Sequence, residues 1–386
     1  MSEWKTCKLS EIGVIVGGAT PSTKNPEFYD GDIPWITPKD LTNWSNMYIS
    51  QGERSITKAG YDSASCKMMP KGSVLFTSRA PIGYIAIAAN EVCTNQGFKS
   101  VVPNTELIDS QFLYYSLIFN KNKIIAMGSG TTFAEISGKV MASVEISLPP
   151  LDIQKKIAAQ LSEIDEKIAV NKKICENLEA QAQALFKHLF VDFAPFKDGK
   201  FVESELGMIP KGWRVGKLSE LIDVKYGKDH KKLLDGNIPV YGSGGLMRKV
   251  EKSLYEGESV LIPRKGTLNN VMYVNEAFWT VDTMFYSIPK LQNIVLFTYI
   301  LLSKKDLASM NAGSAVPSMT TDILNNMQIL IPCVDVLKHF NSLVSALYDQ
   351  IRHNEQESRR LGELRDTLLP RLMSGELKVN DIKTTN

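Results

Sequence analysis

The sequence lacks the features that mark exported, membrane-spanning and metal-binding proteins. Its five cysteines form no C-x-x-C pair, so neither a zinc site nor a disulfide framework is predicted. No stretch approaches the roughly 18 apolar residues of a membrane span, and the N-terminus has no basic segment followed by an apolar run. The four histidines are far apart and lack metal-ligand spacing. We therefore expect a protein of the reducing cytoplasm, without a membrane span, a metal or another cofactor.

The motifs of common nucleotide-handling enzymes are also missing. G-G-A-T at residues 17–20 does not match the G-x-G-x-x-G of a dinucleotide site, and S-G-K-V at 137–140 lacks the spacing of a P-loop. N-P-E-F at 25–28 has only one of the two prolines of an adenine methyltransferase motif. A methyltransferase that acts alone is therefore an alternative that the sequence disfavours. The formal net charge of +2 means that any nucleic-acid surface must come from local clusters of Lys and Arg.

What the chain does contain is a tandem repeat. W-K-T-C-K-L-S-E-I begins at Trp4, and W-R-V-G-K-L-S-E-L begins at Trp213. G-D-I-P-W at 31–35 corresponds to G-N-I-P-V at 236–240, and further on each copy has an apolar run that leads into an arginine-containing turn. Alternating apolar residues predict short strands and hairpins, and each copy ends in one apolar helix, at 112–118 and 296–302. Each copy is interpreted as a mixed α/β domain.

A segment with heptad periodicity follows each copy. Apolar residues recur at alternating steps of four and three, and the same pattern returns in the second segment. Ten positions at a mean spacing of about 3.5 residues are typical of a coiled coil rather than of a single surface helix. The residues predicted to pair the two helices are Ile157, Leu161, Ile164, Ile168, Asn171, Leu178, Phe340, Val344, Leu347, Ile351, Asn354 and Leu361.

The direction of the predicted helix pair is argued from topology. Asn171 and Asn354 lie near the middle of their segments, where they could hydrogen-bond each other and fix the register. A parallel pair would also align them, but the first helix must lead from one domain to the other, which favours an antiparallel pair. Roughly 37 helical residues at about 1.5 Å each give a rod of about 55 Å, longer than the ~34 Å turn of DNA.

The sequence thus predicts an α/β protein with two tandem mixed α/β domains and two long antiparallel coiled-coil helices, arranged with pseudo-two-fold symmetry. The predicted boundaries are residues 1–150 for the first domain, 151–194 for the first helix, 195–333 for the second domain and 334–386 for the second helix and tail. A protein scaffold whose coiled coil binds only other proteins would suit the same architecture and stays open at this point.

Four segments, taken in this order, resemble the specificity subunit of Type I restriction-modification enzymes. They are L-P-P-L-D-I-Q-K-K-I from residue 148, L-E-A-Q-A-Q-A-L-F-K-H-L-F from 178, G-M-I-P-K-G-W from 207 and L-R-D-T-L-L-P-R-L-M-S-G-E-L from 364. The resemblance extends from Trp4 to about Val379. The second helix departs from the first at Ser358 and Arg365, and Pro370 puts the extent of its last turns in doubt.

The resemblance implies a non-catalytic subunit. Two target-recognition domains would each read one half of a bipartite, asymmetric site in double-stranded DNA. The paired helices would act as a ruler and as a docking surface for two methyltransferase subunits, and restriction subunits would join the full complex. We expect the exposed faces of the helices, together with F-K-H-L-F-V-D-F at 186–193, to bind these partners.

Major-groove reading needs side chains with paired donors and acceptors, and such residues occur in the Gly- and Pro-rich loops of the first domain. The predicted DNA-binding residues there are Thr20, Ser22, Lys24, Arg79, Tyr84, Asn95, Gln96, Lys99, Ser129, Thr131 and Thr132. A surface ion pair is the alternative for Arg79, and a turn-capping role is the alternative for Asn95.

Corresponding loops of the second domain supply a second set. Its members are Tyr226, Lys228, Lys231, Arg264, Lys265, Asn269, Thr283 and Ser314. Small hydroxyl-bearing loops are suited to phosphate binding through backbone N–H groups. Phosphate contacts would position each domain, and base contacts would specify the sequence.

Overall fold

The computed structural model describes residues 4–129, 134–310 and 318–379. The chain divides into two compact units, one made of residues 1–173 with 354–386 and the other of residues 174–353. Each unit contains one globular domain and one half of each of two long helices, α6 (Leu151–Phe190) and α9 (Val334–Met373). Within the described residues, no helix combines the length and the apolar character needed to cross a membrane.

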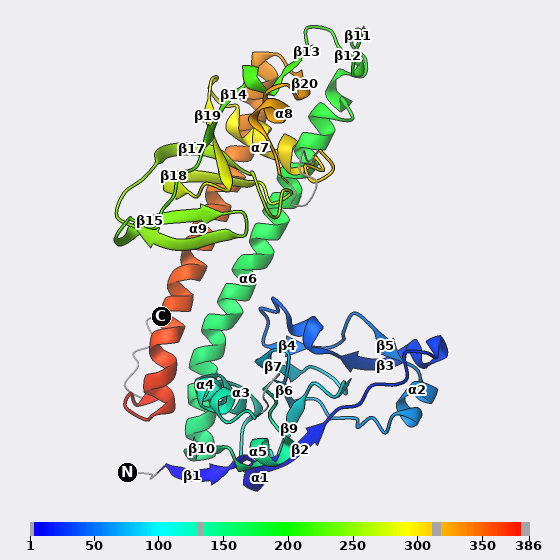
Figure 1. The fold of residues 1–386 in the computed structure, drawn as a ribbon, viewed down its shortest axis with the longest axis vertical. Coiled ribbons are helices and arrows are strands. Elements are labelled where there is room, and N and C mark those ends of the chain that lie inside the picture. Colours follow the sequence, from blue (N-terminus) through cyan, green and yellow to red (C-terminus); the bar gives the residue numbers. More distant parts are fainter. Residues whose placement is uncertain (1–3, 130–133, 311–317, 380–386) are drawn as a thin grey trace. The chain divides into compact units, whose positions relative to one another are not determined.

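The domain of the first unit is built on two small sheets and a strand pair (Figure 1). The five-stranded sheet has the order β2 (Gly13–Gly17), β9 (Lys99–Pro103), β6 (Val74–Ser78), β7 (Ile82–Ala88), β4 (Tyr48–Ile49). The three-stranded sheet has the order β5 (Ser55–Ile56), β3 (Tyr29–Ile36), β8 (Cys93–Thr94), and β1 (Lys5–Lys8) pairs with β10 (Glu145–Leu148). The helices are α1 (Leu9–Ile12), α2 (Lys58–Ser63), α3 (Ser110–Phe119), α4 (Lys121–Ala126) and α5 (Gly138–Ser143).

Helix α3 joins this domain to the long helices. Its residues Phe112 and Tyr115 are fully buried in one hydrophobic cluster with Phe76 of β6. Leu161 of α6 and Leu372 of α9 belong to the same cluster, so the N-terminal half of α6 and the C-terminal end of α9 are part of the first unit's core (Figure 1). This shared core explains the buried apolar residues at these helix ends.

The domain of the second unit has one larger sheet. Its order is β14 (Ile222–Tyr226), β19 (Met284–Pro289), β17 (Tyr255–Pro263), β18 (Met272–Thr280), β15 (Asp235–Gly242), β16 (Gly245–Val250). Two strand pairs are separate from it, β13 (Arg214–Lys217) with β20 (Gln328–Ile331) and β11 (Phe201–Ser204) with β12 (Gly207–Pro210). The helices are α7 (Val295–Ser303) and α8 (Thr321–Asn325).

The two domains follow one plan, which confirms the predicted pair of mixed α/β domains. Strand β2 pairs antiparallel with β9 as β14 does with β19, and β3 pairs parallel with β8 as β15 does with β18. The terminal strand pairs β1–β10 and β13–β20 also correspond. The apolar stretches expected to be helical at 112–118 and 296–302 lie within α3 and α7.

The long helices run antiparallel within each unit. In the first unit the Arg365 guanidinium lies 2.7 Å from Asp165, and Asn171 donates a 2.7 Å hydrogen bond to Glu357. As residue numbers rise along α6, those of the partners on α9 fall. In the second unit Cys175 contacts the carbonyl of Ile351 (3.7 Å), and the ring of Phe186 contacts that of Phe340, so the partner numbers fall there as well.

The predicted pairing residues occupy the side of each helix that is turned from solvent. Seven are buried, namely Ile157, Leu161, Asn171, Phe340, Val344, Ile351 and Asn354. Five are half-buried, namely Ile164, Ile168, Leu178, Leu347 and Leu361. The carboxylate partner of Asn171 was not foreseen, and helix α9 continues past Pro370 to Met373, because a proline in the last turn removes only one backbone bond.

The expected partner-binding role of F-K-H-L-F-V-D-F at 186–193 was wrong for Phe186, Leu189 and Phe190, because these side chains are buried. Phe186 and Phe190 are four residues apart, so their rings share one face of α6. Both rings are buried and lie within 6.0 Å of the Phe340 ring, centroid to centroid, and both also contact Phe297 of α7. These aromatic residues form the core that attaches the second domain to the helices.

Candidate nucleic-acid interface

Three loops of the first domain meet at one end of its five-stranded sheet. Ala19, after β2, donates a 2.9 Å backbone hydrogen bond to the carbonyl of Thr94. Ser78, at the end of β6, donates to the carbonyl of Gly97 (2.7 Å) and accepts from the amide of Ile136 (2.9 Å). These bonds bring predicted residues from distant parts of the sequence to one loop edge.

Two polar side chains at this loop edge contact each other. The Thr20 hydroxyl donates a hydrogen bond to the Gln96 amide oxygen, and both residues come from loops that the sequence marked as DNA-binding. Gln96 is exposed, so its amide can reach a ligand. Asn95 instead accepts a 2.8 Å bond from the amide of Gly97, which is the turn-capping role considered as its alternative.

Two predicted cations share one carboxylate. The Arg79 guanidinium lies 3.8 Å from Glu135, and the Lys99 ammonium lies 3.6 Å from the other oxygen of the same group. Ser129 is held beside them by backbone bonds to Glu135 of 3.0 and 3.2 Å. The ion pair considered as the alternative for Arg79 is therefore present in the structure.

The remaining residues of the first set lie apart. Tyr84 belongs to β7 and lines a hollow with Leu41, Trp44 and Tyr114. Ser22 and Lys24 are exposed in the loop that follows β2. Three predicted residues lie outside the described part of the chain, namely Thr131, Thr132 and Ser314.

Gly18 allows the loops of this edge to approach closely, so a larger residue there is expected to destabilise the first unit. A Cβ at Gly18 would lie 2.1 Å from the carbonyl oxygen of Asn95 and 2.2 Å from that of Thr94. The Gly18→Ala variant is expected to lose about 1–3 kcal/mol of stability, because backbone must move. Amide hydrogen exchange of the first unit measures this. Gly138→Ala is the control, since its Cβ would meet only an ordinary 4.0 Å contact; an equal loss in both variants would contradict the steric argument.

The second domain repeats the backbone bonds that Ser78 makes at this loop edge. Arg264 donates a 2.8 Å backbone bond to the carbonyl of Thr283 and accepts one of 2.8 Å from the amide of Met319. These are the bonds that Ser78 makes in the first domain, so Arg264 is equivalent to Ser78 and Lys265 to Arg79. The turns correspond as predicted, but their arginines are one position out of register.

An aromatic ring and a carbonyl hold the Arg264 side chain. Its guanidinium lies 5.3 Å from the ring centroid of Tyr226, and its Nη1 donates a 3.2 Å bond to the carbonyl of Asp282. The Tyr226 side chain is 51% exposed and packs edge-on against Phe285. The structure thus brings together three predicted residues, Tyr226, Arg264 and Thr283, while Lys228 and Lys231 are exposed in the loop after β14.

Asn269 is occupied by contacts within the domain. Its amide nitrogen donates to Asp306 (3.0 Å), and its amide oxygen accepts from the backbone of Ala308 (2.9 Å). The hydrogen bond from Asn269 is the main cause that lowers the pKa of the Asp306 carboxyl. These bonds tie the turn after Arg264 to the loop after α7, which is a structural role.

Two tryptophans hold the loops that follow β2 and β14, which contain Gly18 and Gly227. Neither tryptophan was among the predicted residues. The Trp35 indole donates a 3.0 Å bond to the carbonyl of Ala19, and the Trp279 indole donates a 2.8 Å bond to that of Lys228. Trp35 lies on β3 opposite Cys93, whereas Trp279 lies on β18 opposite Val240 of β15. The indole thus comes from a different strand in each domain, but it donates to the equivalent carbonyl.

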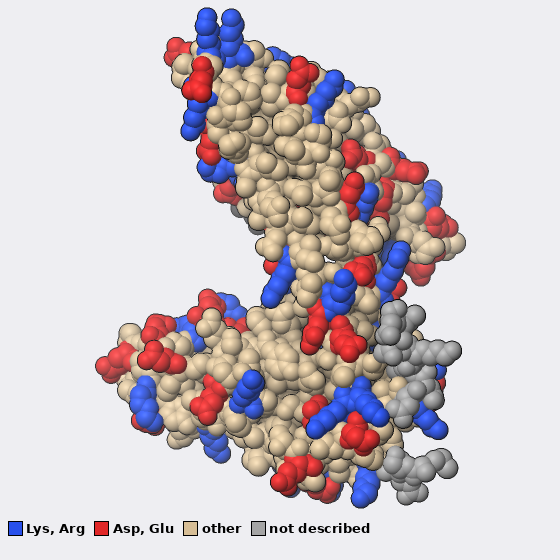
Figure 2. Space-filling view, turned by 180° about the vertical axis from the view of Figure 1, so that it is seen from behind, with Lys and Arg blue, Asp and Glu red and all other residues tan. Residues whose placement is uncertain are grey.

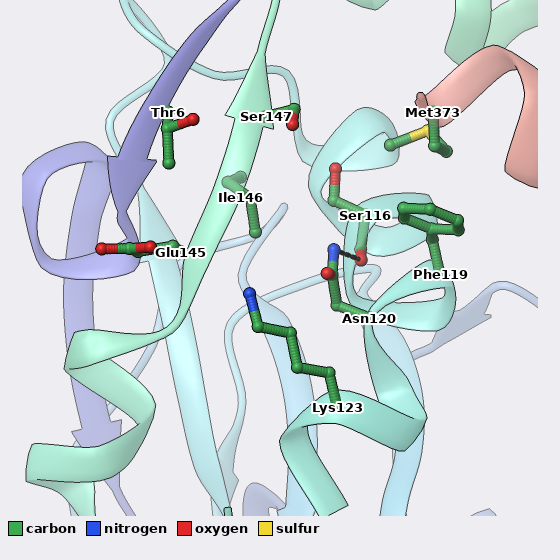
Figure 3. A pocket seen from close by; sticks show the side chains of 9 residues that line it. All are labelled: Thr6, Ser116, Phe119, Asn120, Lys123, Glu145, Ile146, Ser147 and Met373. Carbon is green, nitrogen blue, oxygen red and sulfur yellow. Dashed lines mark hydrogen bonds between the residues drawn. The ribbon is translucent and has the colours of Figure 1, made fainter. Parts of the chain in front are cut away.

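Outside the loop edges, the first unit has a hollow of about 190 Å³ next to the strand pair β1–β10. Figure 3 shows Lys123 of α4, Glu145 of β10 and Met373 of α9 on its walls, with the Asn120 amide bonded back to the carbonyl of Ser116 (2.8 Å). None of the predicted DNA-binding residues lines this hollow. Residues 4–129, 134–310 and 318–379 contain no group of three or more His, Cys, Asp or Glu placed to hold a metal.

Charges on the surface are mixed in sign. On the face of each unit drawn in Figure 2, Lys and Arg side chains stand among Asp and Glu, with broad areas of neither. This agrees with the small net charge of +2. A nucleic-acid interface on this chain must therefore depend on individually placed cations, such as those at the loop edges.

Comparison with known proteins identifies the family. A family model described as the Type I restriction modification DNA specificity domain matches residues 1–180 and 210–361. The chain belongs to this family. It is 35% identical to the MjaIX specificity subunit of Methanocaldococcus jannaschii, covering 98% of this chain and 95% of the relative. It is 24% identical to the HindI specificity subunit of Haemophilus influenzae, covering 98% of this chain and 100% of the relative.

A solved structure supports the fold of this Type I specificity subunit. The S subunit from M. genitalium superposes with a TM-score of 0.63 at 18% identity, covering 96% of both chains. The resemblance inferred from the four sequence segments is thus confirmed. As a specificity subunit, the chain is a non-catalytic component of a Type I restriction-modification system, and the reading as a stand-alone methyltransferase is not favoured.

Proposed function

We propose that this specificity subunit binds double-stranded DNA through its two loop edges, each of which reads one half of a bipartite, asymmetric site. In this proposal residues 1–150 and 195–333 are the target-recognition domains, and residues 151–194 and 334–386 form the helical part. One observation carries the proposal: two domains with the same backbone bonds at the loop edge present different side chains there. Gln96 and Thr20 stand on one edge, and Arg264 and Tyr226 stand on the other.

The chemistry of the loop edges suits DNA. A glutamine amide matches the donor and acceptor of adenine, and an arginine fork matches the two acceptors of guanine. Exposed lysines next to them, such as Lys228 and Lys231, suit phosphate contacts that position a domain. Because the readers differ between the edges, the two half-sites differ in sequence, which makes the whole site asymmetric.

The long helices would dock two methyltransferase subunits, and restriction subunits would join in the full complex. Both helices carry exposed apolar side chains among their charged residues. Val170 and Leu364 are exposed in the first unit, and Ile174 and Leu343 are exposed in the second. Apolar groups on an otherwise charged helix surface are suited to protein contacts.

The test uses the subunit assembled with its methyltransferase subunits. Duplex binding in a gel-shift assay should weaken about a thousandfold or more between 50 and 200 mM salt if roughly six or more phosphates are contacted. Mapping methylated bases in the host genome should give two short blocks separated by unread base pairs. A contiguous motif would contradict the two-domain reading. A scaffold that binds only protein would give no shift, and a methyltransferase that acts alone would modify DNA without partners.

A further inference from the structure

The two loop edges differ in one charged group whose effect on recognition can be tested. We propose that the second domain reads a guanine through Arg264, and that Glu135 prevents the equivalent use of Arg79 in the first domain. Ser318 stands in the second domain where the first has Glu135. This inference rests on the proposed DNA-binding function and names the base class that one half-site must contain.

Backbone bonds establish that Glu135 and Ser318 are equivalent. Ile136 donates to the carbonyl of Ser78 (2.9 Å), and Met319 donates to the carbonyl of Arg264 (2.8 Å). Glu135 and Ser318 are the residues just before these two donors, and each forms an isolated antiparallel bridge, to Ser129 and to Lys265 respectively. Glu135 and Ser318 therefore occupy equivalent positions next to the loop edge, although their bridge partners differ.

In the first domain the carboxylate competes with DNA for the cations. Glu135 lies 3.8 Å from Arg79 and 3.6 Å from Lys99. Guanine offers only neutral acceptors, O6 and N7, to an arginine in the major groove. A guanidinium next to a carboxylate would exchange a charged partner for a neutral one, and the carboxylate would also repel the phosphates. Arg79 is thus held by Glu135 when DNA approaches.

In the second domain neutral groups hold the arginine. Within residues 134–310 and 318–379, neither Arg264 nor Lys265 forms a salt bridge. The Tyr226 ring packs against one face of the guanidinium, and the Asp282 carbonyl accepts a hydrogen bond from one of its nitrogens. Together these contacts orient the side chain. Among the described residues, the other N–H groups of the guanidinium have no hydrogen-bond acceptor and its charge has no acidic partner. An arginine that is oriented before binding loses less freedom when it forms a bidentate contact.

Among the described residues of the first domain, no ring stands at the position that corresponds to Tyr226. The residue equivalent to Tyr226 is Gly17, since Gly17 pairs with Lys99 as Tyr226 pairs with Phe285. Lys99 replaces Phe285, the ring on which Tyr226 packs at 5.0 Å. Among the described residues, the second domain thus has a ring pair under its arginine where the first has Gly17 and Lys99, and it has Ser318 where the first has Glu135. Both differences favour base contact by Arg264.

The experiment compares variants of the full chain assembled with its methyltransferase subunits. Competition binding is measured with duplexes in which each base pair of the methylated motif is replaced in turn. For the wild-type complex, replacing one guanine in one half-site should weaken binding about tenfold to a hundredfold. For Arg264→Ala, that penalty should vanish at this position while the penalties in the other half-site stay unchanged.

Two further substitutions test the role of the carboxylate. Ser318→Glu keeps Arg264 but adds the acidic group, so it should reduce the same guanine penalty. Glu135→Ser should release Arg79 and strengthen DNA binding by the first domain. Arg214→Ala is the matched control, because this arginine of the second domain is already paired with Glu220 at 2.7 Å. Arg214→Ala should leave unchanged the loss of binding caused by replacing each base pair.

A phosphate contact would give a different pattern. If Arg264→Ala weakens binding to all duplexes equally and leaves the methylated motif unchanged, Arg264 touches the backbone and the inference is overturned. If Ser318→Glu and Glu135→Ser have no effect, the proposed role of Glu135 in preventing base contact by Arg79 is overturned. Absence of any duplex binding by the wild-type complex would instead overturn the proposed function itself, so the two failures can be told apart.

Discussion

Replacing Phe340 by alanine is expected to lower the stability of the second unit by about 3–5 kcal/mol. The Phe340 side chain is 0% exposed. Its ring centroid lies 5.0 Å from that of Phe190 and 6.0 Å from that of Phe186, both in edge-on geometry. Truncation removes the apolar burial and these ring contacts, and it leaves a cavity that rigid neighbours cannot fill.

Amide hydrogen exchange measures this loss unit by unit, which a single melting curve of a two-unit chain does not. Leu343→Ala is the control on the same helix, because that side chain is 40% exposed. It should cost less than about 1 kcal/mol. A loss for Phe340→Ala no greater than for Leu343→Ala would mean that the aromatic cluster does not attach the second domain to α9.

The architecture was predictable because it depends on local and repeated patterns. Heptad spacing requires only that apolar residues recur along one helix, and such a pattern is present in the chain before any partner is known. The repeat was visible because strand ends and helix starts kept their residue types, as at Trp4 and Trp213. These signals predicted both domains and both long helices.

Contacts between distant positions were not predictable in the same way. The indole that holds the glycine loop comes from β3 in one domain and from β18 in the other, so no shared sequence position marks it. The partnership of Asn171 with Glu357 depends on how the helices face each other across the pair. Phe186 and Phe190 were assigned to a partner-binding surface together with the exposed helix faces, whereas residues of the second domain cover them in the fold.

The candidate site was predictable as a set of loops but not as a set of side chains. Arg79 and Arg264 were matched because both follow an apolar run, whereas backbone hydrogen bonds show that Arg264 is equivalent to Ser78. Glu135 was not selected at all, since an acidic residue is not expected to bind DNA. Its importance follows only from its distances to Arg79 and Lys99.

The Asp165→Ala variant should lose about 2–4 kcal/mol of stability in the first unit. Asp165 on α6 accepts a 2.7 Å hydrogen bond from the Tyr115 hydroxyl and pairs with the Arg365 guanidinium at 2.7 Å. The two ionic side chains are only 18% and 34% exposed. Without the carboxylate, the buried Tyr115 hydroxyl loses its acceptor and, among the described residues, the half-buried Arg365 keeps only the exposed Asp366 as a partner. Amide hydrogen exchange of the first unit at increasing urea concentration measures the loss.

A double substitution separates the cost of an orphaned charge from the value of the pair. In the heptad pattern the two helix segments are offset by 183 residues, so Arg365 stands where the first helix has Ala182. The seam itself therefore does not require an ion at this position. Asp165→Leu combined with Arg365→Leu should recover part of the stability that Asp165→Ala loses, because apolar side chains can replace an ion pair that is shielded from water, whereas the Tyr115 hydroxyl still lacks its acceptor. Asp366→Ala is the control: this carboxylate also pairs with Arg365, at 2.9 Å, but it is 68% exposed and should contribute less than about 1 kcal/mol. If the double variant loses as much stability as Asp165→Ala alone, the pair contributes specific stability to the helix seam beyond satisfying its own charges.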